Sequence, residues 1–449
     1  MKRWGFLILM LALMPVAVSA QDVPVLTMQE AVDLALENNH GLAADRYDWQ
    51  STNWATAESV SAYLPHVYFT TRWTRMDQES VDEANAYVDL ANQAGQNLDP
   101  VAWEDSYSSS MVVNQPIFNG GAELSNILAN NAQRKERKYN YQNSRATLIR
   151  DVKRAYVNLY AAQELAGVAK ETLALSEQTL AYAKAREELG QISRAEVLRW
   201  EAQKAEQEGA LIEAENTIVN GSIALANLMG QELENRYKLV MPPENQLSAD
   251  LQQAATQSSG NFPAVQAVQG HPSVKQADQA VTLSKVGEFS SVGKLLPNIN
   301  FSYSYAWETN DTLELDGEDN WTAGINFEIP IFQSLGGVFG IVKSHKTVAK
   351  SKQSRTDYTR SFLQQLHMAQ LTLRSAKAQV EAAQKAQAFA KENLDIVSER
   401  HKLGMASNLD LLDAQVNYSR ARSNFIRNVA TFYGALADHD YLLEKSDNQ

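Results

Sequence analysis

Two long runs of this chain carry the same seven-residue pattern of small and apolar residues, which constrains the fold more than any other feature. The first run starts at Leu148, and the second starts 214 residues later at Phe362. The first seam consists of Leu148, Val152, Ala155, Leu159, Ala162, Ala166, Ala169, Leu173, Ser176, Leu180 and Ala183. The second consists of Phe362, Leu366, Ala369, Leu373, Ala376, Val380, Ala383, Gln387, Ala390, Leu394 and Val397. A heptad repeat of this length predicts long helices that pack side by side in left-handed coils, so we expect a duplicated chain built on them.

Each half of the chain shows the same order of elements: a helix, two strands, a very long helix, a turn and a return helix. The first repeat, 21–230, is expected to contain a helix at 27–62, a strand pair within 67–115 and a helical hairpin at 119–230. The second, 263–445, is expected to contain a helix at 272–294, a strand pair at 298–330 and a hairpin at 335–442. A linker, 231–262, joins them. Each long helix would extend about 100 Å at about 1.5 Å per residue.

Smaller signals refine these elements. Thr27 and Glu30 form a capping-box pattern at the first helix. Gln115-Pro116-Ile117-Phe118 is expected to open the first long helix. The return helix of the first repeat has its own predicted seam: Leu198, Ala202, Ala205, Gly209, Ile212, Asn216, Val219, Ile223 and Ala226. The loop between the first two strands is rich in Asp and Glu and is expected to be solvated.

The beginning of the chain predicts export. Residues 1–20 combine Lys2 and Arg3 with an apolar run and a small-residue site ending at Ala20, which is typical of a secretory signal peptide. There is no cysteine, so disulfides and a lipid-carrying cysteine are excluded. The formal net charge of −13 argues against nucleic acid as a partner. No stretch after Ala20 approaches 18 apolar residues, so no transmembrane helix is expected.

The strands alternate between apolar and polar residues. Ile299, Phe301, Tyr303, Tyr305 and Trp307 share one face of the third strand, and Trp321, Ala323, Ile325, Phe327 and Ile329 share one face of the fourth. This alternation also occurs in half-buried sheets of soluble proteins. Three features favour a membrane-spanning barrel instead: strands of about 9–11 residues, aromatic residues near their ends, and export without a spanning helix. Four strands cannot close a membrane barrel, because open edges in lipid leave backbone groups unpaired, so several chains must share one barrel.

The chain resembles the TolC family of bacterial outer-membrane efflux proteins over essentially all of its mature length. The resemblance is carried by the duplicated order and by the following segments: Leu64-Pro65, Leu296-Pro297, Gln115-Pro116-Ile117-Phe118, Ile329-Pro330-Ile331-Phe332, Leu189-Gly190-Gln191-Ile192-Ser193 and Leu403-Gly404-Met405-Ala406-Ser407. It implies a homotrimer with a 12-stranded β-barrel in the outer membrane, four strands from each chain, and a 12-helix α-barrel in the periplasm. It also implies a periplasmic adaptor protein and an inner-membrane transporter as partners of an exit duct for efflux or type I secretion.

The two helix-to-helix turns are candidate partner sites. Gly190 and Gly404 suit the left-handed conformation that ends a helix, and Ser193 and Ser407 begin capping-box patterns with Glu196 and Asp410. A plain turn between two helices explains these residues equally well. The family resemblance implies that such tips meet the adaptor, at Leu189, Gly190, Ser193, Leu403, Gly404 and Ser407.

Asp410 and Asp413 are candidate residues of a periplasmic aperture. Their spacing places them on one helix face after the second tip, and three copies would gather six carboxylates. The resemblance implies that aspartates of a Leu-Asp-Leu-Leu-Asp-Ala run line the narrow end. Alternatively, Asp410 only caps the helix and Asp413 is a solvated acid favoured by the helix dipole. Carboxylates this close should raise at least one pKa. Ala406 and His401 stand where relatives can carry Arg and Tyr, so the closing contacts cannot be carried over.

Enzymatic functions find little support in the sequence. The seven histidines are scattered, without a metal-site spacing, and no cofactor is expected. The competing interpretation is a periplasmic coiled-coil scaffold or adaptor. An adaptor would show one helical hairpin between β-rich modules, whereas this chain shows two hairpins and two strand pairs.

Overall fold

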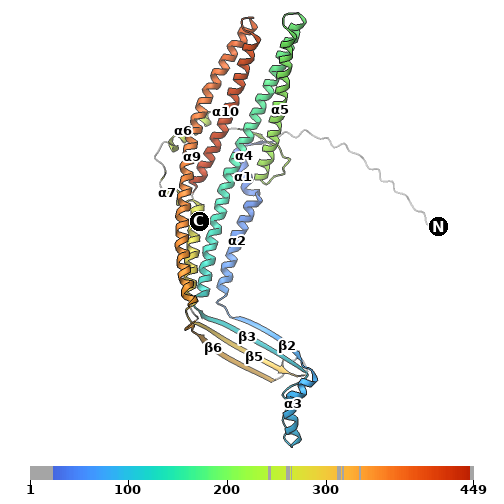
Figure 1. Cartoon of the computed structure of the whole chain (residues 1–449), viewed down its shortest axis with the longest axis vertical. Helices are drawn as coiled ribbons and strands as arrows, with labels where there is room; N and C mark the ends of the chain where they lie inside the picture. Colours follow the sequence, from blue (N-terminus) through green and yellow to red (C-terminus); the bar gives the residue numbers. More distant parts are fainter. Residues whose placement is uncertain are drawn as a thin grey trace, which may run out of the picture. The chain divides into compact units, whose positions relative to one another are not determined.

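A computed structural model of the chain describes residues 24–240, 244–258, 263, 265–310, 315, 318–332 and 335–444. The predicted signal peptide lies outside these residues. The first half contains β1 (Val25–Leu26), α1 (Met28–Asn38), α2 (His40–Ser61), β2 (His66–Arg75), α3 (Gln78–Gln93), β3 (Asp105–Asn119), α4 (Ala122–Glu188) and α5 (Arg194–Leu228). The second contains β4 (Lys238–Leu239), α6 (Glu244–Ser258), α7 (Val265–Val268), α8 (Pro272–Gly293), β5 (Asn298–Thr309), β6 (Glu318–Glu328), α9 (Gly336–Lys402) and α10 (Asn408–Leu443). Figure 1 shows the path of the chain.

The chain divides into two compact units, and each unit draws on both sequence repeats. The first unit takes the residues up to 39 together with 151–255 and 375–434. The second unit takes 40–150, 256–374 and the residues from 435 onwards. The first unit therefore holds both hairpin tips, and the second holds all four long strands. The boundary between the two units therefore cuts across the long hairpins and does not coincide with the boundary between the two sequence repeats.

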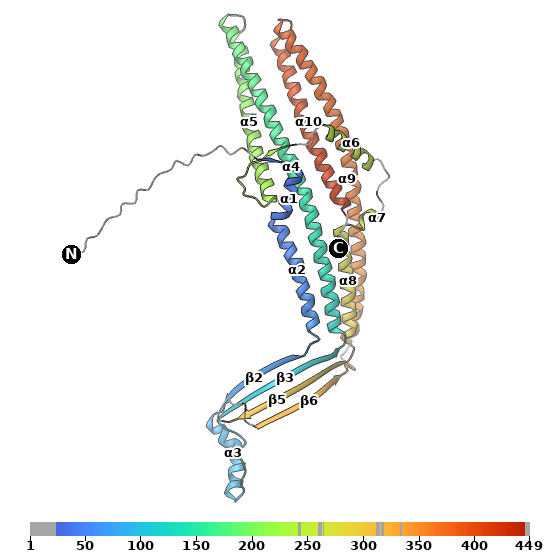
Figure 2. The same cartoon turned by 180° about the vertical axis from the view of Figure 1, so that it is seen from behind.

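The heptad seams pack as predicted. Every residue of both seams is buried or half-buried, and Leu159, Leu366 and Val380 are fully buried. In the first unit, α4, α5, α9 and α10 lie in the order α5, α4, α10, α9 when seen from either side (Figures 1 and 2). The shared seam of α4 and α10 includes Ile426, which packs on Ala161 and Val168. A sustained seven-residue period therefore gives the side-by-side packing that the sequence requires.

Most of the seam predicted for α5 is exposed, and of its residues only Ala226 is buried among the described residues. Leu198 and Ile212 are 51% and 61% exposed, and Val219 and Ile223 are exposed as well. The buried face of α5 starts with Val197, which is fully buried, and Trp200, which lie one and two residues before the predicted seam residues Leu198 and Ala202. α5 therefore carries two neighbouring apolar stripes. The sequence alone cannot say which stripe faces α4.

The N-terminal helix region differs from the single helix predicted at 27–62. The chain forms α1 and α2 with a break at Asn39, whose side-chain amide donates to the carbonyl of Leu228 at 2.9 Å. The capping box of Thr27 and Glu30 is present as predicted. The predicted linker, 231–262, also contains regular structure, because β4 pairs with β1 in parallel and α6 follows it. Tyr156 fixes this region: its buried hydroxyl lies 2.7 Å from the carbonyl of Leu26.

The strand-to-helix junction depends on a contact between two glycine backbones in the second unit. Gly120 has φ of 58°, and a Cβ there would lie 2.1 Å from the carbonyl oxygen of Gly293. The prediction that the segment from Gln115 opens the long helix is wrong. This segment extends β3 to Asn119, and α4 starts only at Ala122. A bulge between Pro116 and Phe118 lets the proline stay in the strand.

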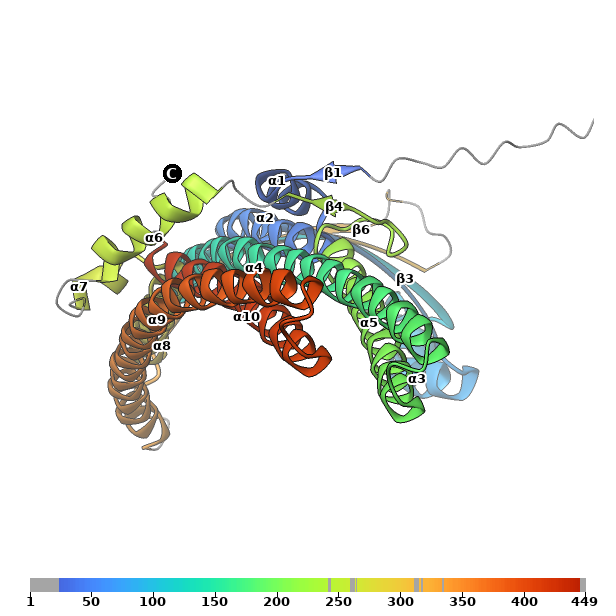
Figure 3. The same cartoon turned by 90° about the horizontal axis from the view of Figure 1, so that it is seen from above.

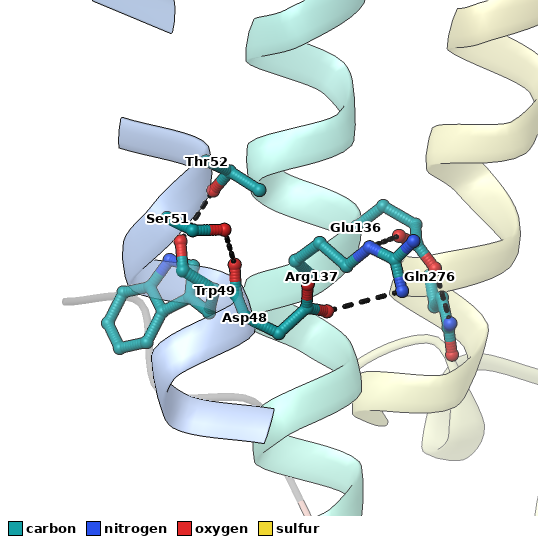
Figure 4. A network of polar contacts seen from close by, with 7 residues as sticks. All are labelled: Asp48, Trp49, Ser51, Thr52, Glu136, Arg137 and Gln276. Carbon is teal, nitrogen blue, oxygen red and sulfur yellow. Dashed lines mark hydrogen bonds and ion pairs between the residues drawn. The ribbon is translucent and has the colours of Figure 1, made fainter. Parts of the chain in front are cut away.

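Three helices of the second unit are joined by a polar network around α4 (Figure 4). Arg137 on α4 forms ion pairs with Asp48 on α2 and with its own neighbour Glu136, both at 3.3 Å. Glu136 in turn accepts a hydrogen bond of 2.6 Å from the amide of Gln276 on α8. α4 is therefore linked to one helix from each repeat.

The four long strands form one antiparallel sheet in the order β2-β3-β5-β6. The register places Phe69, Met111, Tyr305 and Trp321 side by side in one row across all four strands. The row on one side of it, Val67, Val113, Tyr303 and Ala323, is also apolar, whereas the row on the other side, Thr71, Ser109, Trp307 and Asp319, is mostly polar. The alternation predicted for β5 and β6 is therefore confirmed, and their apolar face continues onto β2 and β3 in these rows.

The acidic loop between β2 and β3 contains the helix α3, which the sequence prediction missed. Asp77 caps the helix by accepting from the amide of Ser80 at 3.0 Å. Asn85 fastens the returning chain, because its side chain bonds the carbonyl of Ala102 and the amide of Val101, both at 2.8 Å. Val81, Asn85 and Val88 are buried at heptad spacing. This short pattern could have revealed the helix, but the many acids masked it.

Candidate functional site

The two hairpin tips use the same backbone turn. Gly190 and Gly404 have φ of 69° and 73°, the left-handed region expected at a helix end. The amide of Gln191 bonds the carbonyl of Arg186 at 2.9 Å, and the amide of Met405 bonds that of Arg400 at 2.8 Å. These bonds satisfy the last carbonyls of α4 and α9. Both predicted glycine turns are confirmed.

The caps of the two return helices differ. At the second tip, Ser407 and Asp410 form a complete capping box, with the Ser407 amide 2.9 Å from Asp410 Oδ2 and the Asp410 amide 3.1 Å from Ser407 Oγ. At the first tip, Ser193 has extended backbone angles but its side chain makes no capping hydrogen bond. The predicted box between Ser193 and Glu196 is therefore wrong. The amide of Glu196 bonds the backbone carbonyl of Ser193 instead, at 3.1 Å.

Asp410 and Asp413 are both exposed on α10. Hydrogen bonds from the side chain and the backbone of Ser407 lower the pKa of Asp410 below its ordinary value. For Asp410 within one chain, this is opposite to the direction expected from carboxylate crowding, since stabilisation of the anion by Ser407 prevails. The capping role of Asp410 is thus real, and Asp413 takes no part in it.

A hollow of about 610 Å³ lies between the two tips in the first unit, bordered by residues of both hairpins. His401 connects its walls: Nε2 lies 2.8 Å from Asn408 Oδ1, and the ring meets Tyr182 edge-on with centroids 6.1 Å apart. Leu412 packs against a buried cluster that includes Trp200. The tips of the two hairpins therefore contact each other through aromatic and apolar side chains.

Sequence reasoning missed Tyr182, Trp200 and Leu412 as contacts between the hairpins. Leu412 belongs to the apolar pattern of the last helix, at the position equivalent to Leu198, and Trp200 lies two residues before the predicted seam residue Ala202, so both are apolar residues close to the predicted stripes. Tyr182 precedes the seam residue Ala183, and nothing in the local sequence marks it. His401 was identified as a departure from the family pattern, but its partners were not.

The described residues hold no group of three or more His, Asp or Glu side chains that could bind a metal ion. None of the helices within the described ranges is long and apolar enough to cross a membrane.

The family described as "Outer membrane efflux protein" matches residues 31–231 and 264–433, which is most of both repeats. The chain belongs to this family. Its place is the outer membrane, and the expected resemblance to TolC-type proteins is confirmed.

Individual relatives agree with this assignment. The outer membrane efflux protein BepC of Brucella suis biovar 1 (strain 1330) is 24% identical over 306 residues, a match that covers 68% of this chain and 64% of BepC. The CmeC outer membrane channel of Campylobacter jejuni is 18% identical with a TM-score of 0.77, and the match covers 93% of this chain and 85% of CmeC. The MtrE outer membrane channel of Neisseria gonorrhoeae is 19% identical with a TM-score of 0.75, over 93% of this chain and 88% of MtrE. The chain therefore has the fold of these channels, with long helical hairpins joined to a four-stranded sheet.

Proposed function

We propose that three copies of this chain form a passive exit duct through the outer membrane, serving efflux or type I secretion and opened at its helical tips by partner proteins. The observation that carries this proposal is the sheet. Rows of apolar residues cross all four of its strands on one face, and its outer strands β2 and β6 have no further strand partner among the described residues. In lipid, such edges must be paired.

Pairing β6 of one copy with β2 of the next continues the antiparallel order around a closed ring. Three copies of four strands give 12, within the range of closed membrane barrels. The exposed stripe of α5 supports the same assembly, because Leu198, Ile212 and Val219 repeat at heptad spacing and are exposed in the part of the chain that the structure describes. A scaffold or adaptor needs neither open apolar sheet edges nor this stripe, and the family assignment does not favour it.

The test uses the absence of cysteine from the chain. Thr70→Cys on β2 is combined in turn with Asn320→Cys, Thr322→Cys and Gly324→Cys on β6, and cells are treated with a mild oxidant. We expect one combination to give covalently linked dimers and trimers in the outer-membrane fraction. Only monomers with all three combinations, together with a monomeric mass in detergent, would refute the shared barrel.

We further propose that the tips meet a periplasmic adaptor that recruits an inner-membrane transporter. Leu189 and Leu403 support this, because they are 72% and 71% exposed at the outermost turns. Gly190, Ser193, Gly404 and Ser407 would shape the contact. Leu189→Asp with Leu403→Asp should abolish cross-linking to the adaptor. Leu233→Asp is the matched control, since Leu233 is 50% exposed away from the tips. Equal cross-linking in all three proteins would remove the tips from the contact.

Asp410 and Asp413 would line the periplasmic aperture of the trimer. Asp410→Asn with Asp413→Asn is the informative variant, because an asparagine oxygen can still accept the bonds from Ser407 that an alanine would lose. We expect larger single-channel conductance and weaker block by divalent cations. Unchanged records would leave Asp410 as a cap alone. No enzymatic step is part of this function.

A further inference from the structure

The two return helices carry opposite charges at equivalent positions of the duplication. Glu206 and Glu213 on α5 correspond to Arg420 and Arg427 on α10, each pair separated by the same 214 residues that relate the heptad seams. Along the seams of α4 and α9 the duplication mostly keeps small and apolar residues at equivalent positions, with Gln387 in place of Leu173 as an exception. An exchange of acid for base at two successive heptads therefore distinguishes the facing helices.

All four charged residues line a single hollow of about 610 Å³ within the first unit. The acids form the α5 wall and the arginines form the α10 wall. The floor comes from α4 and consists of Ala162, Leu165, Val168, Ala169 and Thr172. Figure 3, a view along the helices, shows α5 and α10 on either side of α4.

The spacing of the charges matches along both walls. α5 and α10 are both return arms, so they run in the same direction away from their tips (Figure 2). Seven helical residues advance about 10 Å, so Glu206 and Glu213 are spaced like Arg420 and Arg427. Equivalent residues of two such helices lie at similar heights. Each acid therefore has one arginine opposite it.

The four side chains are exposed and make no ion pair or hydrogen bond with any described residue. Other residues fix the same helices to α4. Lys204 on α5 pairs with Glu177 at 3.3 Å, and Arg422 on α10 pairs with Glu171. The ion pairs with Glu177 and Glu171 of α4 thus position α5 and α10. The four charged side chains that face the hollow remain able to pair with each other.

We propose that Glu206 and Glu213 pair with Arg420 and Arg427 across this hollow and draw the two hairpins together over α4. The four residues are positioning residues that set the gap between the hairpins. Paired, they hold the hairpins together; separated, they let the hairpins part. The pairing itself does not depend on the proposed function. Only the role of the gap in opening the duct rests on it.

A third pair extends the ladder toward the tips. Arg199 and Asp413 are again 214 residues apart, again opposite in charge, and one heptad before Glu206 and Arg420. Pairing of Asp413 with Arg199 would neutralise a carboxylate proposed for the aperture. Closure of the hollow and the charge of the aperture are then linked through Asp413.

The test measures closure by a disulfide across the hollow. Ala210→Cys on α5 and Ser423→Cys on α10 both line the hollow, and no other cysteine interferes. A disulfide needs Cα atoms within about 7 Å, so oxidation traps only the closed arrangement. Intact cells are oxidised, and the yield of the intrachain disulfide is then measured from the altered gel mobility of the denatured single chain.

Charge variants are then built on this cysteine pair. Glu206→Arg with Glu213→Arg should lower the initial rate of disulfide formation about tenfold, as expected when two surface ion pairs become two like-charged pairs. Adding Arg420→Glu and Arg427→Glu restores complementarity with the signs exchanged and should restore the rate. Glu215→Arg is the matched control for Glu213→Arg alone, with the same charge change on an exposed residue of α5 that does not line the hollow, and it should keep the rate.

Three results would overturn the inference: no disulfide with native charges, the same rate in the reversed and control proteins, or no recovery when the charges are exchanged. Trimers in the outer-membrane fraction are counted in the same samples. Absence of trimers with native charges would refute the proposed duct. Normal trimers with a rate that ignores charge would refute only the ladder.

Discussion

Acid should destabilise the second unit through His271, a buried residue at the start of α8. Its ring is 1% exposed, and Nδ1 accepts the amide of Ser273 at 3.2 Å. Nε2 lies 3.0 Å from the carbonyl of Tyr441, and the ring packs 4.4 Å from that of Phe362. The neutral tautomer with hydrogen on Nε2 satisfies both bonds. A proton on Nδ1 would face the Ser273 amide and break the cap.

The size and sign of the effect follow from the pKa. Burial lowers the pKa of His271 from 6.5 to about 4. Between these values the unfolded chain binds a proton and the folded chain does not, so stability falls as the pH falls. The contribution is complete above pH 6.5, decreases below it, and is lost near pH 4. A shift of this size corresponds to about 3 kcal/mol for each chain.

The assay compares urea unfolding of the native protein and of His271→Asn, followed by helical circular dichroism from pH 7.5 to pH 4.5. Asparagine is a good helix cap and does not titrate, so the variant keeps the cap acceptor and removes the proton site. Burial also lowers the pKa of His439, but that contribution is common to both proteins and cancels. The stability of the native protein relative to the variant should fall by about 2–3 kcal/mol across this range. Parallel pH profiles would refute the reasoning.

Three further outcomes follow from the contacts described above. Ser407→Ala should cost about 1 kcal/mol and speed amide hydrogen exchange in the first turn of α10, whereas Ser193→Ala should leave the first turn of α5 unchanged; equal effects would contradict the difference in caps. Gly120→Ala should prevent accumulation of folded protein in the outer membrane because its Cβ would lie 2.1 Å from the Gly293 carbonyl, whereas Gly340→Ala, with open space around it, should accumulate normally. Asn85→Ala should expose the chain around Ala102 to added protease on intact cells, since three hydrogen bonds to the returning segment are lost; resistance equal to the native protein would show that these bonds are dispensable.

The sequence predicted the elements whose periodicity is long. The seams of α4 and α9 pack as expected because a heptad repeated many times leaves one helix face to bury. The strands β5 and β6 were found because period-2 alternation separates their faces. The seam of α5 failed because Val197 and Leu198 begin two parallel apolar stripes. One stripe packs against other helices of the same chain, and the periodicity of the sequence does not indicate which of the two stripes does so.

The candidate site was predictable at the level of the backbone and less so at the level of side chains. Gly190 and Gly404 mark the turns because only a left-handed residue ends the helices in this way. Ser193 shows the limit, since the same capping pattern forms at Ser407 and fails at the first tip. The contact between Tyr182 and His401 joins residues far apart in the chain, and no local pattern encodes it.

The unequal caps have a mechanical consequence for the proposed trimer. α10 starts with two side chains bonded to each other's backbone, whereas the cap residue of α5, Ser193, makes no capping hydrogen bond with its side chain. The first turn of α5 should therefore fray more readily than that of α10. Around a threefold rim, compliant and stiff ends would alternate. A partner that inserts between them would find three places that yield and three that resist, so identical partner subunits could not all bind in the same way.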